Sequence, residues 1–267
     1  MPNDSAIAVT AAEIPITSHA DGPGLLGAGM RAIGEQLDAL EDADWSRQTD
    51  CTEWDVRAMV AHMVASAQEQ VRPWLTGTRM LRGRRRYPQR AALDARNQIQ
   101  IDDLAAFDGP TLRARYCELA PKAVAGVRRS PAPLRALRVP SGLPGVPKIQ
   151  LGYLFDVICL RDVWMHGVDI ACATGKPRVA GPADGPAIGQ VIRDLGRQWR
   201  SPAARLTLHG ALEGTWVLGD GEITAELAAD AIELCRSLAG RPADQQPTLV
   251  SGDPTALTNL QQFRVLF

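Results

Sequence analysis

The spacing of apolar residues changes near Gly175, and this change limits the chain to folds with two dissimilar parts. Before that glycine, apolar residues recur every three to four positions, as in Leu26, Met30, Ile33 and Leu37, which is the repeat of an amphipathic helix. After it, short runs such as ARLTLHG and GTWVLGDGEITAEL surround glycine and Asp-Gly turns, which is typical of strands. The sequence therefore predicts a two-domain α+β protein, with a four-helix bundle followed by a small α+β domain.

The first part is expected to form helices over residues 25–41, 53–75, 89–106, 111–129 and 147–174. Thr52 is the predicted N-cap of the second helix, with Asp55 as the acidic member of a capping box. A Gly/Arg-rich loop is expected after that helix, and the proline-rich segment 130–147 is expected to be irregular. The predicted domains are a flexible tail (1–22), a helical bundle (23–177) and an α+β domain (178–267).

The charge balance excludes some classes of partner. Lys and Arg number 29 and Asp and Glu 30, so no general positive field favours nucleic acid or an anionic membrane. Residues 1–22 lack the basic start and apolar core of a signal peptide, and no apolar run approaches the roughly 20 residues of a membrane helix. The five cysteines are widely spaced without a C-x-x-C pair, which suits a reducing compartment. A cytoplasmic protein, monomer or homodimer, is expected.

His62 lies in the apolar stretch CTEWDVRAMVAHMVASAQ. On a helix its neighbours one turn away are Ala58, Met59, Ala65 and Ser66, so the imidazole faces the bundle with space around it. Such a histidine is either a buried neutral ring with a hydrogen-bonded nitrogen or a ligand that awaits partners from another helix.

The stretch RDVWMHGVDI offers those partners. Asp162 and His166 are four residues apart and so lie on one helix face, with Asp169 three residues further on. A carboxylate and an imidazole so placed can share a metal ion in a bundle core. The alternative is a partly exposed Asp–His ion pair of small energetic value.

CTEWDVRAMVAHM, followed about a hundred residues later by RDVWMHGVDIACATG, resembles the DinB-like superfamily, and within it the mycothiol-dependent maleylpyruvate isomerase family of actinobacteria. The resemblance covers most of the chain and implies a metal-binding bundle followed by a domain like that of sterol carrier proteins. It implies that a divalent metal, zinc first and iron or nickel as alternatives, is bound by His62, Asp162 and His166. The family has Glu at the position of Asp162. Asp169 belongs to the same motif and is expected to orient a ligand rather than bind the ion.

The resemblance also implies the chemistry. Two histidines and one carboxylate leave a coordination position open, as in catalytic sites, and a thiol bound there would be deprotonated. The thiol in this family is mycothiol, whose metal-bound thiolate would attack a small electrophile. Arg241, in LAGRPAD, is the implied equivalent of a catalytic arginine that binds a carboxylate; an ordinary solvated charge at a helix end is the alternative.

The sequence is therefore compatible with three functions. The first is a mycothiol-dependent S-transferase or isomerase. The second is a non-haem Fe(II) enzyme that uses the same two-histidine, one-carboxylate set. The third is a ligand-binding protein that keeps the fold without catalysis.

Overall fold

The computed structural model describes residues 9–143 and 146–267, which divide into two compact units. The helical unit comprises residues 18–183, and the mixed unit comprises residues 9–17 together with 184–267. The predicted α+β organisation, with a helical region followed by a sheet with helices, is confirmed.

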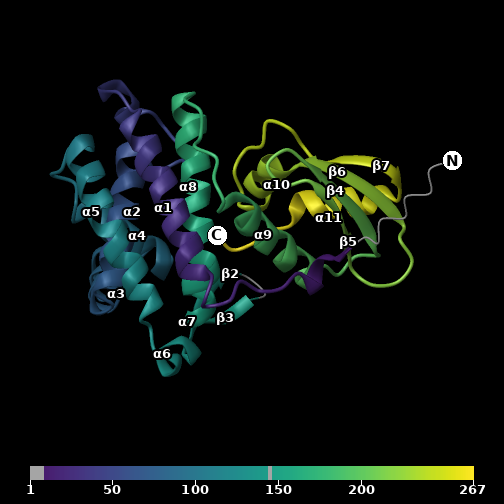
Figure 1. Cartoon of the computed structure of the whole chain (residues 1–267), viewed down its shortest axis with the longest axis horizontal. Helices are drawn as coiled ribbons and strands as arrows, with labels where there is room; N and C mark the ends of the chain where they lie inside the picture. The colour runs from purple at the N-terminus through teal and green to yellow at the C-terminus, as the bar shows by residue number, and fades with distance from the viewer. Residues whose placement is uncertain (1–8, 144–145) are drawn as a thin grey trace. The chain divides into compact units, whose positions relative to one another are not determined.

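Four long helices build the helical unit: α1 (Gly22–Asp38), α2 (Val56–Val71), α5 (Gly109–Arg128) and α8 (Cys159–Thr174). Helix α5 packs against α1 and α2, and α8 packs against α1 and α2 (Figure 1). Their facing sides are apolar at helical spacing, which places one continuous core between them. That core includes Leu26, Met30, Ile33, Leu37, Met59, Met63, Leu112, Tyr116, Val163 and Ile170.

Helix α2 begins one turn later than the sequence predicted. The N-cap is Asp55, whose Oδ1 accepts a hydrogen bond from the backbone N–H of Ala58 at 2.7 Å. Thr52 instead lies in a tight turn, closed by a hydrogen bond from the N–H of Trp54 to the carbonyl of Cys51. The predicted Thr52 cap is therefore wrong, because Thr52 lies in the turn that precedes the helix.

The expected Gly/Arg-rich loop is also wrong. Residues Trp74–Arg86 form helix α3, which packs against α4 (Ala92–Asp102), and α4 in turn contacts α2. Arginine is a good helix former, and Gly83 is buried where α3 meets the backbone of Ala95. The glycine therefore serves a close approach between two helices.

The proline-rich segment is more regular than predicted. It contains helix α6 (Ala132–Ala136) and a two-stranded hairpin of β2 (Arg138–Leu143) and β3 (Val146–Gln150), while residues 144 and 145 lie outside the described part. Both strands of a two-stranded sheet are edges, where proline is tolerated, and the pairing shifts register after Pro140. The expected helix from 147 consequently starts at α7 (Leu151–Tyr153). It continues through a π-helical segment, η3 (Leu154–Ile158), into α8.

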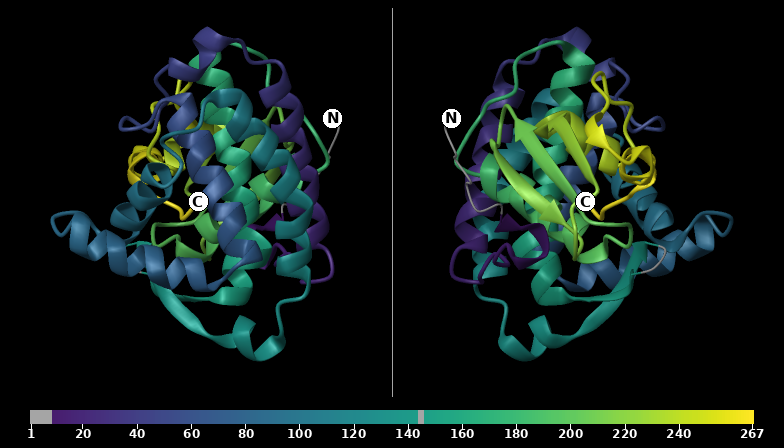
Figure 2. Two further views of the ribbon diagram at one scale, coloured as in Figure 1. Left: turned by 90° about the vertical axis from the view of Figure 1, so that its left-hand side faces the viewer. Right: turned by 90° about the vertical axis from the view of Figure 1, so that its right-hand side faces the viewer.

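The mixed unit is a five-stranded sheet in the order β1-β5-β4-β6-β7. The strands are β1 (Val9–Thr10), β4 (Ala204–His209), β5 (Gly214–Leu218), β6 (Ala225–Asp230) and β7 (Thr248–Gly252). Strand β4 runs parallel to β6 and antiparallel to β5. Figure 2 shows these strands side by side. Buried and partly exposed positions alternate along β4 and β6, so one face of the sheet lies against helices α9 (Asp184–Gln198), α10 (Ala231–Leu238) and α11 (Pro254–Gln262).

Residues 9–17 differ from the predicted flexible tail, of which residues 1–8 lie outside the described part. Strand β1 pairs with β5, and the 3-10 helix η1 (Ala11–Glu13) packs on α9 with Ala11 fully buried. The division between the units falls between Ala183 and Asp184, later than the predicted boundary at residue 177. Residues 9–17 belong to the mixed unit because β1 extends the edge of the sheet and η1 packs on α9.

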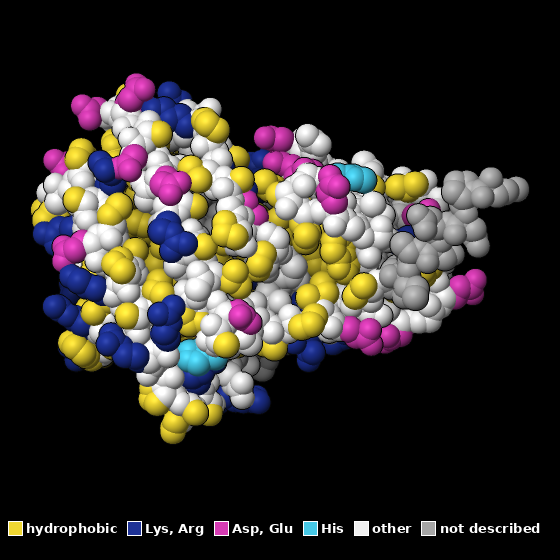
Figure 3. Space-filling view, viewed as in Figure 1, with side chains coloured by type: hydrophobic (Ala, Val, Ile, Leu, Met, Phe, Trp, Pro, Cys, Tyr) yellow, Lys and Arg dark blue, Asp and Glu magenta, His cyan; other side chains and the backbone are white. Residues whose placement is uncertain are grey.

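On the face of the helical unit shown in Figure 3, Asp and Glu side chains lie mainly toward the upper end, and Lys and Arg side chains are more numerous over the lower part. Within the described ranges, no helix combines the length and apolar character needed to cross a bilayer.

Candidate metal centre

His62 lies in the second turn of α2 and is 5% exposed. Its Nδ1 is 2.8 Å from Oε1 of Gln100, a fully buried residue of α4. The apolar spacing of α2 turns this face inward, and the contact with Gln100 fixes the rotation of the ring. The other ring nitrogen, Nε2, is turned toward α8.

Helix α8 presents Asp162 and His166 toward that nitrogen. Nε2 of His166 is 3.3 Å from Oδ1 of Asp162, and Nε2 of His62 is 3.8 Å from Oδ2. One donor atom from each of the three residues lies within 4.8 Å of the others. The structure thus brings His62, Asp162 and His166 together from two helices.

The donor atoms suit a divalent metal ion. Atoms about 2.0–2.2 Å from a tetrahedral zinc ion lie about 3.3–3.6 Å apart, close to the two measured separations. Nε2 of His166 is buried without a well-aligned hydrogen-bond partner among the described residues, although a buried polar atom normally has one. Imidazole nitrogens with a carboxylate are common ligands of zinc and of non-haem iron. These residues therefore fit a metal ion.

The electrostatics show how tightly Asp162 and His166 are coupled. Burial would lower the pKa of His166, but the charge of the adjacent Asp162, and then the contact with Asp169, raise it to about 9. Burial would likewise raise the pKa of Asp162, but the adjacent rings of His166 and then of His62 hold it well below its ordinary value. Without an ion, a proton on His166 supplies the positive charge that Asp162 requires.

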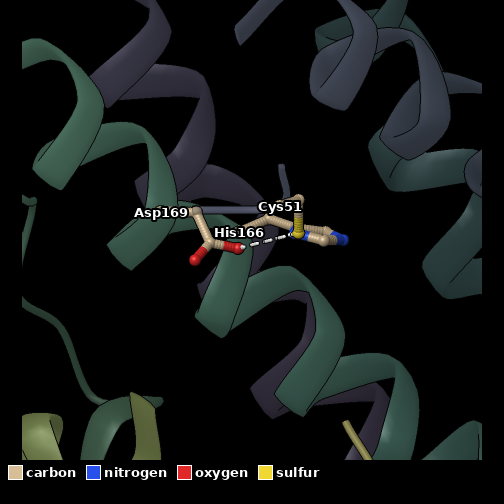
Figure 4. A group of neighbouring side chains, drawn as sticks. All are labelled: Cys51, His166 and Asp169. Atoms are coloured by element: carbon tan, nitrogen blue, oxygen red, sulfur yellow. Dashed lines mark hydrogen bonds and ion pairs between the residues drawn. The ribbon is translucent and has the colours of Figure 1, made fainter. Parts of the chain in front are cut away.

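Asp169, fully buried on α8, lies behind His166, with Oδ2 3.3 Å from Nδ1. The Cys51 thiol donates to the same oxygen at 3.8 Å (Figure 4). Cys51, His166 and Asp169 form a second group with donor atoms within 4.8 Å of one another. Oδ2 of Asp169 contacts Nδ1 of His166, which leaves Nε2 directed at Asp162. The predicted role of Asp169 in orienting a ligand stays a prediction.

Trp54 covers one side of the two imidazoles. Its ring centroid is 4.9 Å from that of His62 and 6.1 Å from that of His166, and the two imidazole centroids are 5.3 Å apart. The turn that ends at Trp54 also carries Cys51, so one short segment supplies both residues.

Cys159, one turn before Asp162 on α8, is not an activated thiol. Burial first, and then the negative charge of Asp162, raise the pKa of its thiol to about 12. This thiol therefore stays protonated at neutral pH.

Arg241 belongs to the mixed unit, at the turn after α10. Its guanidinium donates to the carbonyl of Ala239 at 3.1 Å, and its backbone N–H donates to the carbonyl of Arg236. Its predicted role toward a substrate carboxylate stays a prediction.

The chain is similar to known proteins. Residues 26–171, more than half of the chain, match the family "Mycothiol maleylpyruvate isomerase N-terminal domain". The chain belongs to this family. His62, Asp162, His166 and Asp169 all lie within the matched range.

Solved structures of a mycothiol-dependent maleylpyruvate isomerase, and of a His-to-Ala mutant of such an enzyme, share the fold of this family member. Each is 16% identical over 92% of this chain and 97% of the other, with TM-scores of 0.56 and 0.54. At this identity the likeness shows a common fold. No curated protein matches the chain.

In this member of the isomerase family, the sequence left several neighbours of the site unnoticed. They are Cys51, Trp54, Glu69 and Gln100, none of which the sequence assigned to the site. Glu69 had a usable signal, because it lies seven residues after His62 and so on the same face of an apolar helix. Gln100 had none, since its position opposite His62 depends on how α4 packs against α2.

Proposed function

We propose that this protein is a metal-dependent, mycothiol-dependent S-transferase or isomerase, with a divalent ion, zinc in first place, held by His62, Asp162 and His166. The observation that carries the proposal is the convergence of two imidazole nitrogens and one carboxylate from α2 and α8. Membership of the mycothiol maleylpyruvate isomerase family supplies the thiol.

Each residue of the site has a defined task. Gln100 holds the ring of His62, and Asp169 holds the ring of His166, so that both Nε2 atoms face Asp162. Asp162 contributes the negative charge between them. A divalent ion bound at this point would supply positive charge that lowers the pKa of a nearby thiol and makes its sulfur available as a nucleophile.

The site suits an added thiol because the protein supplies three ligands, which leaves a fourth position for a partner. The Asp162 side chain is 31% exposed while those of both histidines are buried, so solvent reaches the site at the carboxylate. The thiol of Cys159 does not compete for the nucleophile's role, because its pKa of about 12 keeps it protonated. A cytoplasmic location suits this thiol chemistry.

The reaction we propose is addition of the mycothiol sulfur to an electrophilic carbon. A carbon–sulfur bond forms as the thiol loses its proton, and a neighbouring carbon of an activated double bond gains one. If the adduct rotates and then expels the thiol, the outcome is isomerisation; if the adduct is retained, it is transfer. We assign Arg241 to the carboxylate of such a substrate.

The test is a metal assay combined with product analysis. Purified protein, stripped and reloaded with zinc or Fe(II), is incubated with mycothiol and maleylpyruvate, and adduct and isomer are followed by mass spectrometry and chromatography. Zinc-dependent product that forms equally with and without oxygen supports the proposal. Activity only with iron and oxygen would favour the non-haem Fe(II) enzyme instead. Zinc binding without any product across a panel of electrophiles would favour a ligand-binding protein.

A further inference from the structure

We propose that Gln100 and Glu69 are positioning residues that fix the proton of His62 on Nδ1, so that Nε2 is offered to the metal ion. The inference rests on the proposed function for the identity of the site, and it extends that function to residues of α4 and α2 that do not touch the ion. Its basis is a chain of two hydrogen bonds that runs from His62 through Gln100 to Glu69.

Glu69 is a buried carboxylate that the protein keeps ionised. It is 5% exposed, and Arg79 donates to its Oε1 at 3.2 Å while Arg96 donates to its Oε2. Thr76 adds a hydroxyl donor to Oε2 at 3.0 Å. Burial alone would raise the pKa of Glu69, but the charge and hydrogen bonds of Arg96, and hydrogen bonds from Gln100 and Arg79, lower it. An ionised carboxylate can only accept hydrogen bonds.

This charge decides which way the amide of Gln100 points. Oε1 of Glu69 lies 2.8 Å from one end of the amide, and this end must be the NH₂ group because the carboxylate cannot donate. The opposite end, 2.8 Å from Nδ1 of His62, is therefore the carbonyl oxygen. Gln100 is fully buried, so water does not offer the amide an alternative partner.

The orientation of the amide then decides the tautomer of His62. A carbonyl oxygen only accepts, so Nδ1 must carry the proton, and a neutral ring with its proton there has its lone pair on Nε2. That lone pair faces Asp162 on α8. Two groups can accept a hydrogen bond from the ring: the carbonyl of Gln100 at Nδ1 and the carboxylate of Asp162 at Nε2. If the amide were removed, only Asp162 would accept, and the proton would move to Nε2, the atom that a metal ion needs.

The Nδ1 atoms of the two histidines thus have different hydrogen-bond partners. His166 has a carboxylate, Asp169, behind Nδ1, whereas His62 has a neutral amide whose direction is set by a carboxylate one bond further away. The inward face of α4 supplies this amide, so α4 becomes part of the site although it carries none of the proposed ligands.

The experiment uses the full-length protein with ¹⁵N-labelled histidine. Long-range proton–nitrogen correlation spectra of the metal-free form distinguish the two tautomers, and His62 is assigned by its loss in a His62→Ala variant. Zinc affinity is measured separately by chelator competition. In Gln100→Met, which keeps the volume but removes the amide, we expect the Nδ1–H pattern of His62 to disappear and zinc affinity to fall about 10–100-fold.

Two further variants separate positioning from general damage. In Gln190→Met a buried glutamine of α9 is replaced in the mixed unit, and this matched control should leave both readouts unchanged. In Gln100→Glu two buried carboxylates must share a proton, so the protonated side chain introduced on α4 can donate to Glu69 and accept from His62, and the Nδ1–H pattern should return.

Wild-type tautomer and zinc affinity in Gln100→Met would overturn the inference, as would failure of Gln100→Glu to restore the pattern lost in a folded Gln100→Met. Neither readout involves thiol chemistry. If the tautomer depends on Gln100 but the zinc-loaded protein forms no thiol product, the proposed function fails and the positioning role stands.

Discussion

Asp162 lies between two imidazole rings, and its short side chain still reaches both. Its two carboxylate oxygens are 3.3 and 3.8 Å from the Nε2 atoms of His166 and His62, so the loss of one methylene relative to the family's glutamate does not open the site. The carboxylate is also the negative charge that makes the cluster attractive to a cation. Asp162 is therefore the residue whose replacement is most informative.

We expect Asp162→Asn to lower zinc affinity by at least about 10–100-fold, because the shape is kept while the charge is lost. Asp162→Glu should retain zinc but change the rate of thiol-adduct formation, since the longer side chain moves the ion. Zinc content after dialysis, measured by mass spectrometry beside adduct formation, checks both. Full zinc content and activity in Asp162→Asn would show that this carboxylate is not a ligand.

Zinc binding should release about one proton at neutral pH. The raised pKa of His166, about 9, means that its ring is protonated below that pH in the metal-free site, and this proton must leave before Nε2 binds an ion. Apparent zinc affinity should accordingly increase as pH rises toward about 9 and level off above it. Calorimetry in buffers of different ionisation enthalpy measures the proton count, and a count of zero near pH 7 would contradict the coupling between His166 and Asp162.

At this scale the sequence singled out the three residues that the structure brings together, but not the side chains around them. The four-residue spacing of Asp162 and His166 is visible in one helix, and His62 is conspicuous in an apolar stretch. Gln100 and Cys51 reach the site only because separate segments fold against α2 and α8. No local pattern encodes such contacts.

At the scale of elements, apolar periodicity correctly predicted the long helices. The predictions that rested on composition, for the Arg-rich and proline-rich runs, were wrong. The Arg-rich run of α3 suggested a loop, although arginine favours helices. The proline-rich run suggested an irregular backbone, although Pro131 and Pro133 lie at a helix start and Pro140 lies in an edge strand, positions that accept proline. The π-helical segment η3 before α8 has no sequence signal that we recognise.

The contact between α2 and α5 gives a prediction about Gly126. A Cβ at this position would overlap the backbone carbonyl of Gln70, whereas a Cβ at Gly77, exposed on α3, would meet nothing within 4 Å. Gly126→Ala should therefore lose about 1–3 kcal/mol of unfolding free energy through overpacking. Gly77→Ala should gain up to about 1 kcal/mol from helix propensity. Urea denaturation followed by circular dichroism measures both, and equal effects of the two substitutions would refute the close approach.

At the scale of the whole chain, the sequence predicted two domains but assigned the N-terminal segment to a tail. Strand β1 pairs with β5, which follows it by about two hundred residues, and the amide of Gln190 on α9 donates to the carbonyl of Pro15 at 2.8 Å. Pairing over such a distance leaves no periodic trace in a two-residue strand. The mixed unit is consequently built from both ends of the chain.

This arrangement predicts that Ala11 matters to the mixed unit. Ala11 is fully buried against Gly196 of α9, while the neighbouring Ala12 is partly exposed. Ala11→Asp should lose at least about 1–3 kcal/mol of unfolding free energy, because it places a carboxylate among apolar atoms. Ala12→Asp is the matched control and should have little effect. Thermal and urea unfolding compare the two, and a harmless Ala11→Asp would mean that residues 9–17 are a tail after all.

The most direct test of the account is anomalous diffraction at the zinc absorption edge from crystals of the zinc-loaded protein. We expect one strong peak about 2.0–2.2 Å from Nε2 of His62, Nε2 of His166 and a carboxylate oxygen of Asp162. A peak beside Cys51 and Asp169 instead, or bound zinc that leaves these three side chains without a peak, would contradict the assignment of the metal centre.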